Sequence, residues 1–241
     1  MLLLAGTGEA RQIAGALALE NIPAMASMAG ATRDPKPLAI FTRFGGFGGA
    51  EAFTDFIGQQ NITAILDATH PFAARISNRT AEIAKTMAVP YMQLLRPPWH
   101  AEPGDLWTMI ASEQNAADHI PIGSTVFLAT GRQTLKRYEN MVGRQLICRQ
   151  IDPPEAPFPY ANGEFLIGRP PFSVEDETAL FENLGVDWLV VKNAGGQTSR
   201  TKLTAARNLS IPVAMVQRPL QPKVDKVETV EQALQWVRGL A

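Results

Sequence analysis

The second half of the chain repeats the first, and this repeat constrains the fold more than any other feature. The run Phe-Leu-Ala-Thr-Gly at residues 127–131 resembles Leu-Leu-Ala-Gly-Thr-Gly at residues 3–8, with Leu128 lying 124 residues after Leu4. The apolar runs 62–66 and 186–190 are separated by the same 124 residues. Such regular spacing indicates two copies of one structural unit.

A third pair of segments follows the same spacing. Residues 211–219, which contain Ile-Pro and then Arg-Pro, repeat residues 89–97 at an offset of 122. Between these landmarks, short apolar runs alternate with helical patterns, as in parallel sheets covered by helices. The sequence therefore predicts an α/β fold with two similar Rossmann-like halves, residues 1–121 and 122–241. We expect parallel sheets and a ligand cleft between the halves.

The first loop of the chain has the composition of a phosphate-binding loop. An apolar strand from Leu2 runs into Gly6-Thr7-Gly8-Glu9 and then into a helical pattern over residues 10–19. Glycines permit a tight turn, and the helix N-terminus attracts anions. The dinucleotide fingerprint is incomplete, because Arg11 occupies the third glycine position and the next glycine is Gly15. A nucleotide-binding loop and a structural turn both remain open.

The next strand ends in residues that bear on cofactor choice. A strand expected at 24–28 leads to Thr32 and Arg33, where an acidic residue would suit a free ribose hydroxyl. Thr32 and Arg33 instead suit a 2′-phosphate, which favours NADP over NAD. An ordinary basic loop is the alternative.

Two further loops extend the predicted cofactor site. A β-prone run at 38–41 precedes the segment 43–49 (Arg-Phe-Gly-Gly-Phe-Gly-Gly), which predicts a fitted turn before a helix near Ala50. A flexible linker is the alternative. A buried strand at 62–66 ends in Asp-Ala-Thr-His, at the strand end where open α/β sheets bind ligands. Beyond the first loop, the predicted cofactor residues here are Arg43, Gly45, Gly46, Asp67, Thr69 and His70.

His70 is the weak candidate for a catalytic acid or base. Its imidazole titrates near neutral pH and follows a strand end. Because Pro71 comes next, His70 equally suits a turn that caps the following helix. We expect it to orient a ligand rather than to serve as an obligatory acid.

The second half concentrates basic residues in one stretch of the sequence. Lys192, Arg200 and Lys202 lie within eleven residues, and the run 197–202 enters a helix whose N-terminus attracts carboxylates. A solvated basic turn is the alternative. The predicted substrate-binding residues are Thr130, Gly131, Arg132, Lys192, Asn193, Gly195, Gly196, Arg200 and Lys202.

Three other segments complete the expected elements. Residues 105–110 and 112–120 predict a strand and a helix that close the first half. The proline-rich run 152–159 predicts either a lid or a connector.

Composition excludes several classes of partner. With 22 basic and 23 acidic residues, the net charge of −1 offers no general field for nucleic acid or an anionic membrane. The single Cys148 excludes an internal disulfide and a cysteine-based metal site, and no metal is expected. The first residues lack a basic segment and no apolar run reaches membrane-spanning length, so we expect a cytoplasmic protein.

These motifs together resemble the precorrin-6A reductases of cobalamin biosynthesis, including the cobalt-precorrin-6A enzymes, over nearly the whole chain. The most specific is Asp-Ala-Thr-His-Pro-Phe-Ala at 67–73, and Ala194 stands where a serine or another small residue is expected. The resemblance implies NADPH-dependent reduction of a ring double bond in precorrin-6A, giving precorrin-6B. The tetrapyrrole substrate carries many carboxylates, which suits the basic second half.

Two other functions remain open from the sequence. The chain could be a different NADPH-dependent reductase on the same scaffold, or a non-catalytic module that binds a nucleotide or a tetrapyrrole. The sequence leaves open whether the substrate contains cobalt, which group donates the proton, and the oligomeric state.

Overall fold

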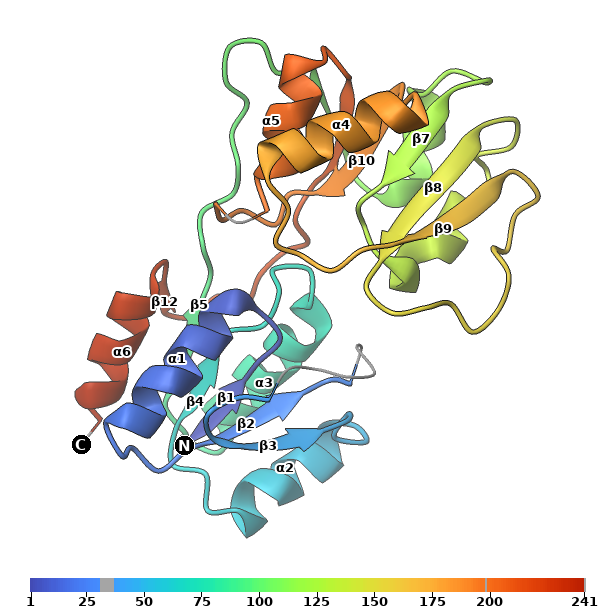
Figure 1. Ribbon diagram of the computed structural model, residues 1–241. Helices are drawn as coiled ribbons and strands as arrows, with labels where there is room; N and C mark the ends of the chain where they lie inside the picture. The colour runs from blue at the N-terminus through green and yellow to red at the C-terminus, as the bar shows by residue number, and fades with distance from the viewer. Residues whose placement is uncertain (31–36, 198, 241) are drawn as a thin grey trace. The chain divides into compact units, whose positions relative to one another are not determined.

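The chain forms two compact units. The structure is a computed structural model that describes residues 1–30, 37–197 and 199–240. Unit 1 comprises Met1–Pro97 and Pro219–Ala241, and unit 2 comprises Pro98–Arg218. Each unit holds one six-stranded sheet in which all neighbouring strands are parallel (Figure 1). The predicted α/β class with two Rossmann-like halves is confirmed.

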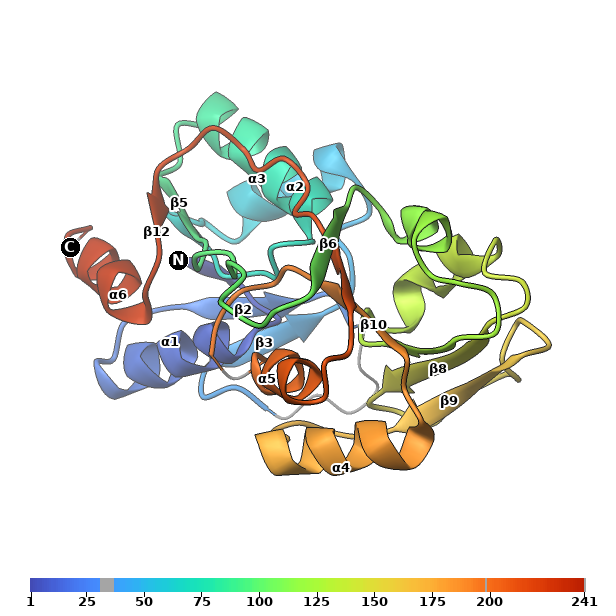
Figure 2. The same ribbon diagram turned by 90° about the horizontal axis from the view of Figure 1, so that it is seen from above.

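The sheet of unit 1 has the strand order β12-β5-β4-β1-β2-β3. Its strands are β1 (Leu2–Leu4), β2 (Met25–Met28), β3 (Phe41–Phe44), β4 (Ile65–Asp67), β5 (Tyr91–Leu94) and β12 (Lys226–Val227). Its helices are α1 (Gly8–Leu19), α2 (Ala50–Gln59), α3 (Ala74–Thr86) and α6 (Val230–Arg238). Figures 1 and 2 show α1 beside α6, and α2 beside α3.

Strand β1 organises the core of unit 1 because it is buried on both faces. Leu3 packs with the apolar faces of α1 and α6, whereas Leu2 and Leu4 pack with α2 and α3. Successive side chains of a strand point to opposite faces, so an uninterrupted leucine run suits a central parallel strand. The register joins Leu4 to Ser27 on one side and to Asp67 on the other. The loops after β1, β2 and β4 therefore lie at one edge of the sheet.

The sheet of unit 2 has the order β6-β11-β10-β7-β8-β9. Its strands are β6 (Trp107–Ile110), β7 (Thr125–Leu128), β8 (Gln145–Gln150), β9 (Gly163–Ile167), β10 (Trp188–Lys192) and β11 (Val213–Val216). The helices α4 (Val174–Leu184) and α5 (Thr201–Asn208) pack against each other. Two 3₁₀ helices, η1 (Glu113–Asp118) and η2 (Arg132–Tyr138), also pack together.

The division at residues 121 and 122 expected from the repeat differs from the division in the structure. Strand β6, expected to close the first half, pairs with β11 of unit 2, and β12 pairs with β5 of unit 1. Each sheet thus takes its sixth strand from the other half of the sequence. The repeat identifies the shared strands, but the sheet that an edge strand joins depends on non-local pairing, which no local pattern encodes.

Two smaller elements also differ from expectation. Only Phe41 of the β-prone run 38–41 belongs to β3, and the helix expected at 112–120 is the 3₁₀ helix η1. The proline-rich run 152–159 lies in the connection between β8 and β9. In that connection the ring of Phe158 packs against Phe165, with ring centroids 4.9 Å apart.

Candidate active site

The loop between β1 and α1 is built as a tight turn that ends in a capped helix. Gly6 has a φ of +139°, which glycine adopts without strain. The Oγ1 atom of Thr7, the N-cap residue, accepts a hydrogen bond from the Ala10 N–H (3.1 Å) and donates one to the Ala68 carbonyl (2.8 Å). Thr7 therefore joins the loop after β1 to the loop after β4, where the strand order reverses direction. Such switch points bind ligands in open α/β sheets.

Space remains above the first turn of α1. A Cβ atom built on Gly8 would meet no neighbouring atom within 4 Å. The first amides of a helix have no acceptor within the helix, and the Thr7 hydroxyl accepts a hydrogen bond from the Ala10 N–H. A valine at Gly8 would fill this space. The residues present thus fit a phosphate group held by backbone amides.

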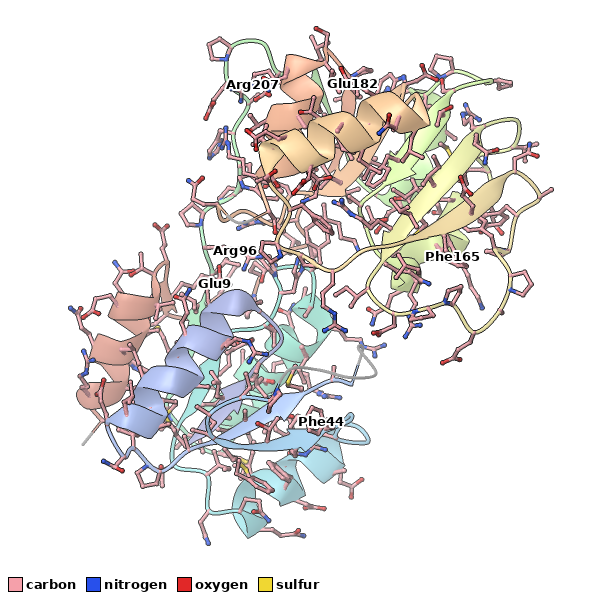
Figure 3. The ribbon with its side chains drawn as sticks, viewed as in Figure 1. Glu9, Phe44, Arg96, Phe165, Glu182 and Arg207 are labelled. Atoms are coloured by element: carbon pink, nitrogen blue, oxygen red, sulfur yellow. The ribbon has the colours of Figure 1, made fainter. Side chains whose placement is uncertain are left out.

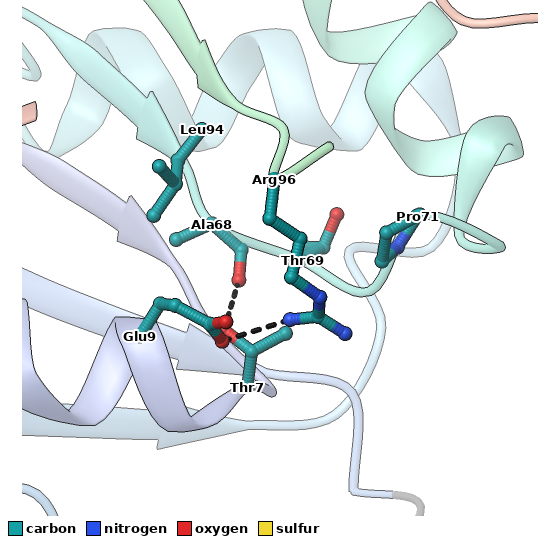
Figure 4. Close-up of a pocket in the computed structure, with 7 residues that line it drawn as sticks. All are labelled: Thr7, Glu9, Ala68, Thr69, Pro71, Leu94 and Arg96. Carbon is teal, nitrogen blue, oxygen red and sulfur yellow. Dashed lines mark hydrogen bonds and ion pairs between the residues drawn. The ribbon is translucent and has the colours of Figure 1, made fainter. Parts of the chain in front are cut away.

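A small pocket opens beside this turn (Figure 4). Arg96 and Glu9 point toward one another across it, and the Arg96 Nη1 atom lies 2.8 Å from the Glu9 Oε2 atom (Figure 3). Their side chains are 15% and 28% exposed, so the ion pair is partly shielded from water. The pocket is lined by Thr7, Glu9, Ala68, Thr69, Pro71, Leu94 and Arg96.

Arg96 lines this pocket and was not among the site residues predicted from the sequence. The repeat drew attention to the Arg-Pro pair only as a landmark. The signal was available, because Arg96 follows β5 closely and so lies at the same sheet edge as the phosphate loop.

The second glycine loop is a fitted turn that Arg43 holds together. Its guanidinium donates to the carbonyls of Gly45 and Gly46, each at 3.0 Å, and to the Ser27 hydroxyl at 2.8 Å. It also lies 4.1 Å from the centroid of the Phe47 ring. These contacts contradict a flexible linker. They also occupy much of the hydrogen-bonding capacity of Arg43, so the loop's backbone is better placed than this guanidinium for meeting a cofactor.

Asp67 lies behind the site. Its side chain is fully buried. The Oδ1 atom accepts hydrogen bonds from the Thr69 N–H (3.0 Å) and the Thr69 hydroxyl (2.7 Å). The Oδ2 atom accepts one from the Tyr91 hydroxyl (2.7 Å). Burial and the Asp67 charge raise the pKa of Tyr91, which keeps this hydroxyl protonated as a donor. Asp67 was predicted as a cofactor residue, and in the structure its carboxylate fixes the Thr69 turn. Thr69 itself lines the pocket.

His70 belongs to the turn that precedes α3. Its Nδ1 atom accepts a hydrogen bond from the Phe72 N–H at 3.2 Å, and its carbonyl accepts one from Ala73 at 2.7 Å. A ring nitrogen that accepts a hydrogen bond carries no proton, so this contact favours the neutral tautomer protonated on Nε2. The geometry matches a turn residue whose ring is held in a fixed direction. Thr32 and Arg33, the predicted 2′-phosphate residues, lie outside the described residues.

In unit 2, Lys192 is part of an internal network. Its Nζ atom donates to the Thr130 carbonyl at 3.0 Å and lies 3.6 Å from the Glu113 Oε1 atom. Burial lowers the pKa of Lys192, although Glu113 opposes this shift. Burial would raise the pKa of Glu113, but hydrogen bonds and the charges of Lys192 and Arg137 hold it below its usual value. Lys192, predicted to bind substrate, is therefore a partly buried cation that supports the loop after β7.

The loop after β7 is shaped for a close approach. Gly131 has a φ of +75° and a Cβ there would meet nothing within 4 Å. The Thr130 side chain is turned inward, with its hydroxyl 3.0 Å from that of the buried Tyr138. Arg132 follows at the start of η2 and is half-buried. Gly131 and Arg132 are thus both partly exposed in this loop.

Asn193 is buried and serves the chain itself. Its Oδ1 accepts from the Trp99 N–H at 2.8 Å, and its Nδ2 donates to the Trp99 carbonyl at 3.0 Å. Gly195 and Gly196 follow with φ values of +68° and +82°. This side chain fixes a loop that the glycines allow to turn. The predicted direct contact between Asn193 and a substrate would require breaking both hydrogen bonds.

The other two predicted cations also have partners. Arg200 pairs with Glu102, and Lys202 donates to the Ser199 carbonyl at 2.7 Å. Burial lowers the pKa of Lys202 to about 8. A freely solvated basic face formed by these residues is therefore not what the structure contains. Among the described residues, no group of three or more His, Cys, Asp or Glu is arranged to hold a metal ion.

Comparison with known proteins gives a consistent result. Residues 1–238 match the family model described as precorrin-6x reductase CbiJ/CobK. The chain is 41% identical to a precorrin-6A reductase of Rhodococcus erythropolis, over 100% of this chain and 98% of the relative. It is 39% identical to one of Sinorhizobium sp., over 97% of this chain and 90% of that relative.

A solved structure agrees with the sequence comparisons. A protein described as CobK precorrin-6A reductase superposes with a TM-score of 0.95 at 35% sequence identity, covering 100% of this chain and 96% of that chain. The chain belongs to the precorrin-6A reductase family of cobalamin biosynthesis.

Proposed function

We propose that the protein reduces precorrin-6A to precorrin-6B with NADPH. The observation that carries this proposal is the match over residues 1–238, joined to a capped helix N-terminus with open space above Gly8. When bound, NADPH would supply a hydride to one carbon of the ring double bond and become NADP⁺, and a proton added to the neighbouring carbon would complete the saturation.

The dinucleotide lies over unit 1 in this proposal. The amides of Gly8 and Glu9 receive a phosphate, and Thr7 keeps the turn in place through Ala68. Arg96 supplies a cation at the same pocket and balances Glu9. The backbone of Gly45 and Gly46, held by Arg43, completes this edge of the sheet.

Thr32 and Arg33 set the preference for NADPH over NADH. A guanidinium bound to the 2′-phosphate makes charge-assisted hydrogen bonds. Arg33→Ala should weaken NADPH binding roughly ten- to hundredfold, the equivalent of losing a hydrogen bond to a charged group, and leave NADH binding unchanged. Steady-state kinetics with both cofactors provide the test. Equal losses for the two cofactors would remove this role from Arg33.

The tetrapyrrole contacts unit 2 through the loop after β7 and the loop after β10. Gly131 and Arg132 offer an amide and a guanidinium for substrate carboxylates, and the exposed Lys136 adds a charge on η2. Lys192 holds the Thr130 carbonyl and so positions this loop. Gly195 and Gly196 provide backbone groups after β10, with Arg200 and Lys202 at the following helix.

His70 orients a ligand through its fixed ring. The Phe72 N–H donates to the Nδ1 atom and so fixes the direction of the ring. If His70 were the sole acid, His70→Ala would cost two to four decades of rate, roughly the range for general acid catalysis. We expect a smaller loss in the rate constant and a clear rise in the Michaelis constant. Single-turnover kinetics would separate the two effects.

The function itself is tested by incubating the purified protein with precorrin-6A and NADPH. Loss of nicotinamide absorbance with formation of a product two hydrogens heavier is the expected result. Binding of both compounds without turnover would leave a carrier instead of an enzyme.

The lone cysteine, which is buried, supports the cytoplasm as the compartment. No helix among the described residues is long and apolar enough to span a bilayer.

A further inference from the structure

The chain passes between its two units twice, and both passages are stiffened by proline. We name residues 96–99 (Arg-Pro-Pro-Trp) the first connector and residues 218–221 (Arg-Pro-Leu-Gln) the second connector. The unit boundary falls between Pro97 and Pro98 in the first and between Arg218 and Pro219 in the second. Proline fixes its own φ and restricts the residue before it. Both connectors are therefore poor at absorbing a displacement locally.

On the side of unit 1, each connector is fastened to a loop of the proposed cofactor site. Arg96 of the first connector pairs with Glu9, in the first turn after Gly8. Gln221 of the second connector donates from Nε2 to the Pro71 carbonyl at 2.8 Å and to the Pro219 carbonyl at 2.9 Å. Its Oε1 atom accepts a hydrogen bond from Gln93 at 3.0 Å. Glu9 and Pro71 both line the pocket of Figure 4.

On the side of unit 2, both connectors are fastened to one loop, residues 193–196. The Asn193 side chain binds the backbone of Trp99, and the Trp99 Nε1–H donates to the Gly196 carbonyl at 2.8 Å. Arg218 donates to the carbonyls of Asn193 (2.7 Å) and Ala194 (2.9 Å). Trp99 and Asn193 are only 6% and 5% exposed. These hydrogen bonds are shielded from water and hold both connectors to the loop after β10.

We propose that the connectors couple the two ligand sites, so that cofactor bound at the Gly6–Glu9 loop strengthens tetrapyrrole binding at the 193–196 loop. Gln221, Arg96, Asn193 and Arg218 are the positioning residues of this coupling. Each connector has one end on a cofactor loop and the other on the same substrate loop, so a shift at one loop is passed along a short stiff segment. This inference rests on the proposed function, which places NADPH on unit 1 and the tetrapyrrole on unit 2.

Gln221 is the best position for a test, because it contacts a pocket-lining carbonyl without lining the pocket itself. Gln221→Leu removes the hydrogen bonds to Pro71 and Pro219. Gln221→Glu is nearly isosteric, keeps the acceptor for Gln93 and loses the Nε2 donor. Gln59→Leu, at an exposed position at the end of α2, is the matched control.

The experiment measures NADP⁺ affinity by calorimetry on the full chain, with and without saturating precorrin-6A, a pair that does not turn over. For the unmodified protein we expect precorrin-6A to tighten NADP⁺ binding by about fivefold or more, the lower range of couplings between sites. In both Gln221 variants the ratio of NADP⁺ affinities with and without precorrin-6A should fall close to one. The affinity for NADP⁺ alone and the affinity for precorrin-6A alone should each change by less than about threefold, and the melting temperatures should be normal. Gln59→Leu should keep the original ratio.

Several outcomes would overturn the coupling. A ratio of one in an active unmodified protein refutes it while leaving the proposed function intact. An unchanged ratio in folded Gln221→Glu protein removes the second connector from the coupling and refutes the proposal as stated. If the unmodified protein binds no NADP⁺ and shows no turnover with NADPH, the proposed function fails, and the coupling fails with it.

Discussion

At the scale of single residues, the environment of a side chain decides its role more than its type does. Lys192, Arg200 and Lys202 look alike in the sequence, yet their surroundings in the structure differ. Lys192 donates to a backbone carbonyl, Arg200 pairs with a carboxylate, and Lys202 is largely buried. Charge counting predicted three equivalent cations. It could not foresee Glu113 and Glu102, which come from elements about 80 to 100 residues earlier in the chain.

Gly8 is the residue on which the cofactor site is most easily tested. Gly8→Val should lower NADPH affinity by at least about tenfold, because the side chain fills the space that a phosphate needs. The fold should survive, since a Cβ at this position meets nothing within 4 Å. Calorimetry measures the affinity. Gly15→Val, the same change farther along α1 with equally open surroundings, should leave NADPH binding unchanged.

Lys202 should make stability depend on pH. Its folded-state pKa of about 8 lies below the ordinary value of 10.5, so between these values the unfolded chain binds more protons than the folded chain. The free energy of unfolding therefore rises with pH through this window. Lys202→Met should stabilise the protein at pH 7 by on the order of 1 to 3 kcal/mol, and the gain should shrink toward pH 10. Urea titrations at several pH values measure it.

The exposed Lys136 provides the control for this pH effect. Lys136→Met removes the same charge from a solvated position on η2. It should leave the difference in unfolding free energy between pH 7 and pH 9.5 unchanged. An identical pH profile for Lys202→Met and the unmodified protein would show that Lys202 is not the group responsible.

At the scale of elements, the sequence was most informative where a pattern is local. The leucine run of β1, the glycine turn before α1 and the strand that ends at Asp67 follow from apolar runs and turn chemistry, and all are present. The first glycine loop could therefore be placed from the sequence. Strands β8 and β9 were not anticipated, because the proline-rich run between them obscured their pairing. Gln221 could not be found at all, since its contact with Pro71 spans 150 residues.

The connection between β8 and β9 depends on the absence of a side chain at Gly163. A Cβ atom there would collide with the Phe158 ring, which packs against Phe165 and Tyr160. Gly163→Ala should expel Phe158 and destabilise unit 2 by about 1 to 3 kcal/mol, as overpacking does. Thermal unfolding measures this loss. Gly58→Ala, inside α2 with open surroundings, should be neutral or slightly stabilising.

At the scale of the whole molecule, the exchange of edge strands makes the two units unequal as fragments. Unit 2 is one continuous segment, residues 98–218, whereas unit 1 needs the C-terminal β12 and α6. Residues Ala233, Leu234 and Val237 of α6 belong to the same apolar core as α1. A repeat visible in the sequence thus does not mark where the chain can be cut.

Fragment experiments should reveal this inequality. Residues 98–218 expressed alone should unfold cooperatively on heating, because every strand of their sheet is present. Residues 1–121 should not, because they lack β12 and α6 and carry β6 without its partner β11. Circular dichroism and proton chemical-shift dispersion report the difference. A cooperative transition for residues 1–121 would show that the exchanged elements are dispensable.

The late arrival of β12 has a consequence for synthesis on the ribosome. The first strand of the protein to emerge, β1, lies in the middle of a sheet whose last strand is made only after residue 225. Residues 1–97 can therefore complete their sheet only after their C-terminal partners have been made. A chain truncated before residue 219 leaves the apolar side of α1 without the cover of α6, which is the kind of surface that chaperones bind.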